Sequence, residues 1–230
     1  MEVIAYIETD FKTKFGLPRQ SSLIKDIKGR IVFEKKYRDI LSVRGLEAFS
    51  HIWVIWEFSL AKKEKWSPTV RPPMLGGNKR MGVFATRSPF RPNSIGLSCL
   101  KIEKVDLQSK DAPVIYVSGC DMMNGTPIYD IKPYLPYCDS HPEASGGFAE
   151  TVKERNLDVV FPSDLIEIIA EDKRDVLLKV LKSDPRPSYQ NDSERQYGFL
   201  YADYEIGFTV DGEILTVNRV EIKQTRGKEC

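Results

Sequence analysis

The stretch Ile52-Trp53-Val54-Ile55-Trp56-Glu57-Phe58 decides the fold class of this 230-residue chain. It is rich in β-branched and aromatic residues, which favour strands, and it is too short for a typical helix. Similar strand-like segments lie on both sides of it, at residues 2–8, 81–86, 95–105 and 113–119. Within this β-rich first two-thirds of the chain, one short helix is predicted, over residues 39–49. Several strands without amphipathic helices between them predict a β-barrel or a sandwich rather than a parallel α/β sheet.

The composition changes near residue 140. Residues 139–175 contain ten acidic and four basic residues, a net charge of −6. Apolar residues between Leu165 and Leu181 follow near-helical spacing, and Asp211-Gly212 separates two alternating segments as a hairpin turn does. We therefore expect a mainly β N-terminal domain followed by a small α+β domain. The expected boundaries are residues 1–144 and 145–230.

The composition also argues against several classes of protein. Hydrophobic residues make up 41% and charged residues 29%, which is typical of globular proteins. No apolar run approaches the roughly 20 residues that span a bilayer, and the N-terminus lacks the features of a secretory signal. The four cysteines form no Cys-x-x-Cys pair and only two histidines are present, which argues against a zinc site. We expect a cytoplasmic protein with neither a membrane nor a metal partner.

A basic segment is concealed by the net charge of +1. Residues 62–104 contain ten basic and two acidic residues, a net charge of +8, so the remainder of the chain totals −7. A basic face on a near-neutral protein indicates an anionic partner, although a solvated loop would show the same pattern. Within this segment, residues 67–82 are rich in proline and glycine. Such stiffened loops on a β scaffold are common places for binding sites.

Nucleotide-binding motifs of the familiar kinds are absent. Gly77–Gly82 has the spacing of a Walker A loop, but Val83-Phe84 follow where Lys and Ser/Thr are required. No Gly-x-Gly-x-x-Gly follows a strand, so a Rossmann cofactor site is not supported either. Polar chemistry is concentrated instead in three segments, at Phe15–Gln20, Gly45–Trp53 and Val70–Leu97.

Taken together, motifs in these segments and beyond them resemble the TrmO family, in its TsaA-like domain. The resemblance covers about residues 1–140 in the family's order and is carried by Pro18–Gln20, Arg44–His51, Val70–Pro73, Met81–Ser88, Phe90–Asn93 and Gly125–Tyr134. The later run Asp184–Tyr189 resembles a short motif in the C-terminal extension of bacterial members.

The resemblance implies a single-sheeted β-barrel, S-adenosylmethionine as methyl donor, and a homodimer. It further implies tRNA as the substrate. The methylated atom would be N6 of the threonylcarbamoyl-modified adenosine at position 37, beside the anticodon, in threonine tRNA.

Carried over motif by motif, the resemblance also implies site residues. Those of the cofactor pocket are Pro18, Arg19, Gln20, His51, Ile52, Arg87, Leu97, Asn124, Gly125, Thr126 and Pro127. Our candidates for binding tRNA are Arg71, Lys79, Arg80, Arg91 and Arg186, because Arg and Lys bind phosphate. Two positions depart from the family: Asn124 stands where Asp is common, and Ser94 stands where Pro often follows Asn.

The sequence does not assign a catalytic base. Asp130, Tyr134 and His51 are polar candidates near the site-forming motifs. Two other functions remain open, a non-catalytic barrel that binds RNA and a methyltransferase with another substrate. A hydrolase built on Cys138 and His141 is disfavoured, because the nucleophile and base of such enzymes normally meet through the fold rather than as sequence neighbours.

Overall fold

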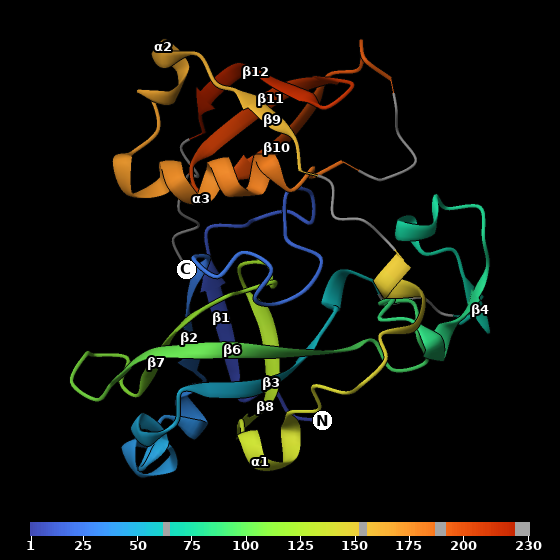
Figure 1. Cartoon of the computed structure of the whole chain (residues 1–230). Coiled ribbons are helices and arrows are strands. Elements are labelled where there is room, and N and C mark those ends of the chain that lie inside the picture. Colours follow the sequence, from blue (N-terminus) through green and yellow to red (C-terminus); the bar gives the residue numbers. More distant parts are fainter. Residues whose placement is uncertain (62–64, 152–155, 187–191, 224–230) are drawn as a thin grey trace.

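The computed structural model describes residues 1–61, 65–151, 156–186 and 192–223. Its main feature is a closed six-stranded barrel in which every neighbouring pair is antiparallel (Figure 1). The order around the barrel is β1-β2-β7-β6-β3-β8. The bounds are Ala5–Thr9 (β1), Lys28–Phe33 (β2), His51–Glu57 (β3), Ile95–Asp106 (β6), Val114–Ser118 (β7) and Thr126–Pro133 (β8). The predicted single-sheeted barrel is confirmed.

Strand β3 shows why this sequence closes a barrel. Every second side chain of β3 is buried, namely Ile52, Val54 and Trp56, so one face of the strand points into the barrel. Burying an apolar side chain of this size contributes about 1.5–3 kcal/mol. Gly96 of β6 lies under the Trp56 ring, where an added Cβ would come within 2.2 Å of the indole. Glycine at that position therefore allows the largest inward side chain to fit.

A second sheet has four strands in the order β10-β11-β12-β9, and two helices accompany it. The bounds are Asp158–Val160 (β9), Ser163–Ile166 (α2), Glu171–Lys182 (α3), Tyr197–Tyr201 (β10), Tyr204–Asp211 (β11) and Ile214–Ile222 (β12). Helix α3 buries Leu177, Val180 and Leu181, as the helical spacing predicts. The hairpin predicted at Asp211-Gly212 connects β11 to β12. This α+β part lies above the barrel in Figure 1.

Two local predictions are wrong. Residues 39–49 form two short 3-10 helices, Ile40–Val43 (η2) and Leu46–Ala48 (η3), because Gly45 between them has a left-handed φ of 87° that no helix continues through. Residues 81–86 contain only the two-residue strand β5 (Met81–Gly82), which pairs with β4 (Thr69–Val70), followed by η6 (Val83–Ala85). The remaining short helices are η1 (Lys35–Tyr37), η4 (Ser59–Ala61), η5 (Pro73–Leu75), α1 (Pro136–Asp139) and η7 (Gly147–Thr151).

The segment from residue 10 to residue 27, here called the N-terminal loop, packs against the second sheet. Phe15 contacts the rings of Tyr197, Phe199 and Phe208 at centroid distances of 6.5, 6.2 and 6.4 Å. Next to it, Gly16 has a φ of 87° and lies so close to Phe199 that an added Cβ would be 2.4 Å from the ring. The loop is thus fitted into an aromatic cluster.

Polar contacts fasten the same loop to the second sheet and to α3. Lys173 binds Asp10 at 2.6 Å, Lys179 binds Asp26 at 2.6 Å, and Lys12 binds Asp203 at 2.8 Å. Each pair is exposed enough to contribute little by itself. Together with the ring cluster they fix the position of the loop between the barrel and the second sheet.

Candidate functional site

Strand β6 is longer than its neighbour β7, so the first half of β6 has no strand partner on that side, and we call this unpaired stretch the gap. The register pairs β6 with β7 only from Lys101 onward. In the gap, Ser21 and Ser22 of the N-terminal loop bind the edge of β6: Cys99 N donates to Ser21 Oγ at 3.3 Å, and Ser22 Oγ donates to Cys99 O at 3.3 Å. Ser22 N donates to Gly119 O at 2.9 Å. The end of the N-terminal loop therefore replaces a strand at this edge.

A half-buried carboxylate lies at this gap. Ser98 Oγ donates to Asp121 Oδ1 at 2.6 Å, and Trp56 Nε1 donates to Ser98 Oγ at 2.9 Å. Burial raises the pKa of Asp121 to about 6, although the Ser98 hydrogen bond and the charge of Arg87 act in the opposite direction. Asp121 therefore changes charge in the neutral to weakly acidic range.

Arg87 and Gln20 meet at the same place. Arg87 Nη1 donates to the side-chain carbonyl of Gln20, which joins the motif Met81–Ser88 to the motif Pro18–Gln20. Gln20 immediately precedes Ser21, and Arg87 acts on Asp121 through its charge. We call the five residues Gln20, Ser21, Arg87, Ser98 and Asp121 the edge cluster.

Two more predicted pocket residues adjoin the edge cluster. Leu97 precedes Ser98 on β6 and is 53% exposed, so an apolar side chain borders the polar groups. Arg19 precedes Gln20 and donates from Nη2 to the carbonyl of Arg186 at 3.1 Å, which ties this end of the N-terminal loop to the second part of the chain. Pro18, half-buried, completes the motif.

The turn Asn124–Pro127 supports the start of the N-terminal loop. Asn124 Oδ1 accepts from Thr9 N at 3.1 Å, and Asn124 N donates to Phe11 O at 2.7 Å. Gly125 has a φ of 76°, a conformation that favours glycine. Thr126 and Pro127 are buried. The Asn that departs from the family pattern thus has a role in the backbone of this turn.

His51 and Ile52 are not brought to the edge cluster. Ile52 is fully buried in the barrel and pairs with Pro133. His51 lies on the outer face of β3, where its ring contacts Ser50 Oγ at 2.9 Å and the Tyr134 ring at 6.2 Å. Since Ser98 pairs with Val54, His51 is three residues further along β3, roughly 10 Å away at about 3.3 Å per residue.

Of the other two candidate bases, Tyr134 lies beside His51, whereas Asp130 of β8 pairs with Ile55, four residues further along β3. Asp130 is paired with Lys132 at 3.0 Å. Tyr134 packs against the ring of Trp53, at 5.7 Å, as well as that of His51. The contacts described for these side chains include none to the edge cluster, so the structure does not single out a catalytic base.

Three of the predicted tRNA-binding residues are exposed near the β4–β5 hairpin. Arg71 lines a shallow pocket together with Pro73, Gly76, Gly77 and Asn78, and Lys79 follows directly in the sequence. Arg80 Nη1 donates to Thr69 Oγ1 at 2.7 Å. Lys62 and Lys63 of the basic segment lie outside the described residues. Among the described residues, no ion pair involves Arg71, Lys79 or Arg80, so their charges are available to an anionic partner.

The remaining two predicted tRNA contacts are placed differently. Arg91 is half-buried: its Nη1 donates to Thr86 O at 2.7 Å, and its guanidinium lies 5.8 Å from the Phe84 ring, so it shapes its own loop. Arg186 is only 2% exposed and binds Asp184 through Nε and Nη2 at 2.8 and 3.0 Å. Burial argues against a phosphate contact by Arg186. Pro187–Tyr189 of the same motif lie outside the described residues.

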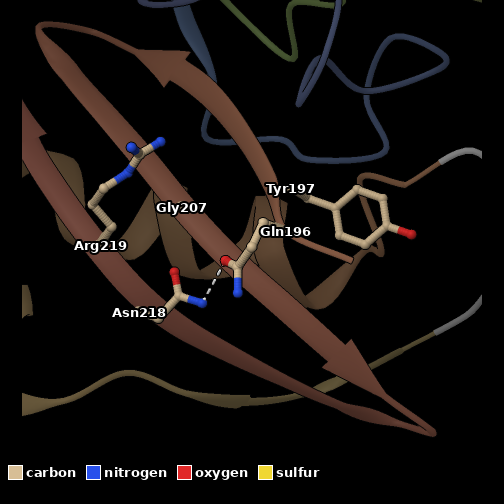
Figure 2. Close-up of a pocket in the computed structure, with 5 residues that line it drawn as sticks. All are labelled: Gln196, Tyr197, Gly207, Asn218 and Arg219. Atoms are coloured by element: carbon tan, nitrogen blue, oxygen red, sulfur yellow. Dashed lines mark hydrogen bonds between the residues drawn. The ribbon is translucent and has the colours of Figure 1, made fainter. Parts of the chain in front are cut away.

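Another pocket lies on the second sheet, lined by Gln196, Tyr197, Gly207, Asn218 and Arg219 (Figure 2). Three of its polar side chains have partners, because Asn218 Nδ2 donates to Gln196 Oε1 at 2.8 Å and Arg219 pairs with Glu205 at 3.0 Å. The Tyr197 hydroxyl is buried and makes no hydrogen bond to any described residue. We place the candidate site at the edge cluster, because two of the predicted cofactor-pocket motifs meet there. Within the described part of the chain, no group of His, Cys, Asp and Glu side chains is arranged to hold a metal, and no helix is long and apolar enough to cross a membrane.

Sequence reasoning missed Ser21, Ser98 and Asp121. The only signal for Asp121 is that it is the single charged residue in the otherwise uncharged run Ser118–Gly125. Ser21 and Ser98 carry no signal, because their importance comes from the gap between β6 and β7.

Two family models match the chain. They are the tRNA-methyltransferase O N-terminal domain, over residues 6–140, and the TrmO C-terminal domain, over residues 154–223. A tRNA (adenine(37)-N6)-methyltransferase of Escherichia coli (strain K12) is 40% identical over 217 residues, which cover 91% of this chain and 92% of that protein. A Pyrococcus abyssi protein named for binding S-adenosyl-L-methionine is 31% identical over 177 residues, 71% of this chain and 90% of its own.

Solved structures agree with these relatives. The crystal structure of TrmO from Pseudomonas aeruginosa matches with a TM-score of 0.76 and 28% identity, and the match covers 96% of this chain and 97% of that one. The likeness therefore extends over the barrel and the second sheet alike.

Proposed function

Because this chain belongs to the TrmO family, we propose that it is an S-adenosylmethionine-dependent tRNA (adenine(37)-N6)-methyltransferase. The observation that carries the proposal is the 40% identity to the Escherichia coli enzyme of that name, which extends over 92% of that enzyme. The geometry supports it, because the structure brings motifs at residues 18–20 and 81–88 together at one edge of the barrel.

The edge cluster has the chemistry that the methyl donor requires. S-adenosylmethionine carries a carboxylate, an ammonium, a cationic sulfonium and a nucleoside. Arg87 supplies a planar cation suited to a carboxylate, and Gln20 supplies an amide that can bind polar groups of the nucleoside. Asp121 supplies the negative charge that favours a cation nearby, and exposed Leu97 supplies apolar surface. When bound, the donor would supply an electrophilic methyl group.

The chain itself must position the nucleophile. Methyl transfer needs the attacking nitrogen in line with the methyl carbon at about 3–3.5 Å, and such positioning can lower the barrier by about 7–11 kcal/mol. A carbamoylated N6 resembles an amide and is a poor nucleophile, so removal or polarisation of its proton would add roughly 10²–10⁴-fold. Asp130, Tyr134 and His51 all have partners away from the edge cluster, so we leave the base unassigned.

For the substrate, we propose the threonylcarbamoyl-modified adenosine at position 37 of threonine tRNA, approached by the exposed cations Arg71, Lys79 and Arg80. A homodimer in the cytoplasm is part of the same proposal, as is a division into domains at residues 1–144 and 145–230. Family resemblance supports the tRNA substrate, the homodimer, the cytoplasmic location and the domain division. The exposure of Arg71, Lys79 and Arg80 supports the tRNA face.

The proposal is tested by incubating the protein with isotopically labelled S-adenosylmethionine and total tRNA, then identifying the modified nucleoside by mass spectrometry. We expect label on the N6-threonylcarbamoyladenosine nucleoside, in the threonine tRNA fraction. A label-free tRNA pool would contradict the enzymatic proposal and favour an RNA-binding barrel. Label on another molecule would favour a methyltransferase with a different substrate.

A further inference from the structure

We propose that Trp66 and Phe84 form a stacking surface for an unpaired base of the anticodon loop, and we call this pair of rings the aromatic platform. The inference rests on the proposed function, since it takes tRNA to be the substrate. The two residues flank the β4–β5 hairpin in the sequence, and this hairpin carries the exposed cations Arg71, Lys79 and Arg80.

Two large rings are left exposed next to each other at this place. Trp66 is 51% exposed and Phe84 is 71% exposed, and their ring centroids lie 6.2 Å apart with an angle of 32° between the planes. The guanidinium of Arg91 lies 5.8 Å from the Phe84 ring. A single exposed aromatic side chain needs no explanation, but two adjacent ones with a cation beside them indicate a partner that covers them.

The backbone that carries Phe84 is held by other residues. Val83 is only 1% exposed, and its N–H donates to Pro68 O at 2.9 Å, which ties η6 to the segment before β4. Arg91 Nη1 donates to Val83 O at 3.4 Å and to Thr86 O at 2.7 Å, so the same turn is also held from its C-terminal side. The exposed ring is therefore positioned by its surroundings without being needed to hold them together.

The charge around the aromatic platform indicates the class of partner. Residues 65–91 contain six basic residues and no acidic one. Cations beside exposed aromatic rings are suited to single-stranded nucleic acid, because the cations bind phosphates while the rings stack on bases. A second copy of this chain fits less well, since a twofold contact of this surface with itself would bring two sets of cations together.

The anticodon loop supplies unpaired bases close to the phosphates that the cations would bind. Phe84 lies four residues after Arg80, so their Cα atoms are at most about 14 Å apart. The proposed target, the adenosine at position 37, belongs to the same loop. Bases of the paired stem are already stacked on their neighbours and are closed to the rings. The aromatic platform would thus select the loop, whereas the cations bind the RNA backbone of stem and loop alike.

The test compares filter binding of threonine tRNA and of a blunt RNA duplex over a salt series. We expect Phe84→Ala and Trp66→Ala each to weaken tRNA binding by about tenfold, the effect of losing one base–aromatic stack, and to leave duplex binding unchanged. The slope of log affinity against log salt should stay as in the wild type, because neither side chain carries a charge. Phe84→Tyr keeps the ring and should bind as the wild type does. Tyr137→Ala, which removes an 85% exposed aromatic side chain of α1, is the matched control.

Tryptophan fluorescence gives a second measurement, which reports the stacking itself. Trp56 is only 5% exposed and Trp53 is half-buried, so Trp66 is the most exposed of the three tryptophans. We expect tRNA to quench the emission of the wild type. Trp66→Phe retains a ring for binding, and in this variant the quenching should be lost.

Three results would overturn the inference. They are wild-type tRNA affinity in both alanine variants, equal losses for tRNA and duplex, and quenching that persists in Trp66→Phe. A changed oligomeric state of Phe84→Ala in sedimentation would also overturn it, because the rings would then cover a second copy of the chain. Absence of tRNA binding and methylation by the wild type would instead contradict the proposed function, so the two failures are distinguishable.

Discussion

At the scale of single residues, the site depends on short polar contacts that could not be predicted from the sequence. Arg87 and Gln20 were identified from motifs, and they do meet. Ser21, Ser98 and Asp121 were not identified, because a serine or aspartate gains its role only when the fold places it at a gap. Burial also reassigns residues: a motif predicts Arg186 as a phosphate contact, yet its guanidinium is enclosed with Asp184.

Asn124→Asp tests the departure of this chain from the family pattern. The carboxylate of Asp would still accept from Thr9 N, as Asn124 Oδ1 does at 3.1 Å, and it would add a negative charge near the proposed pocket. Because S-adenosylmethionine carries a sulfonium, we expect its affinity to rise by about threefold at low salt, the effect of roughly 0.7 kcal/mol in a solvent-screened setting. Calorimetry at low and high salt measures this, and an unchanged affinity at both would separate Asn124 from the pocket.

At the scale of elements, the strands could be predicted and the short helices could not. Alternation along β3 and β6 reflects burial of one face, which is a property of local sequence. The helix predicted over residues 39–49 fails at Gly45, whose left-handed backbone divides it into η2 and η3. The gap between β6 and β7 exists because β7 is shorter than β6. The sequence of one strand does not predict the length of the strand that pairs with it.

Gly16→Ala tests whether the N-terminal loop depends on the second sheet. The new Cβ would lie 2.4 Å from the Phe199 ring and would occupy a φ of 87°, so both a clash and backbone strain are introduced. We expect the free energy of unfolding to fall by about 2–4 kcal/mol, measured by urea denaturation. Gly76→Ala, with a φ of 73° and no atom within 4 Å, has the strain without the clash and should lose only about 1 kcal/mol. Equal losses in the two variants would show that the aromatic cluster does not confine the loop.

At the scale of the whole molecule, charge and architecture are divided along the chain. The predicted barrel and α+β part are present, and the basic segment exposes Arg71, Lys79 and Arg80 around the β4–β5 hairpin. Arg87 follows the β4–β5 hairpin by five residues in the sequence, but its contact with Gln20 of the N-terminal loop exists only in the fold, so composition alone could not predict it. The second sheet and helix α3 hold the N-terminal loop, through the ring contacts of Phe15 and three ion pairs.

Replacement of the exposed cations tests the tRNA face. Arg71→Ala and Lys79→Ala should each weaken tRNA binding and reduce the slope of log affinity against log salt by about 1, since each removes one phosphate contact. Filter binding over a salt series measures both quantities. Lys35→Ala is the control, because residues 35–48, the blue segment at the lower left of Figure 1, lie on the other side of the view from β4. A salt slope that changes only in Lys35→Ala would place the RNA on the opposite face.

The central claim is that the donor binds at the edge cluster, and calorimetric titration of S-adenosylmethionine into three variants tests it most directly. Arg87→Ala and Gln20→Ala should each bind at least about tenfold more weakly than the wild type, because each loses a polar contact made in the pocket. His51→Ala, whose ring contacts Ser50 and Tyr134 instead, should bind as the wild type does. Loss of binding in His51→Ala, with wild-type affinity in the other two variants, would contradict the account.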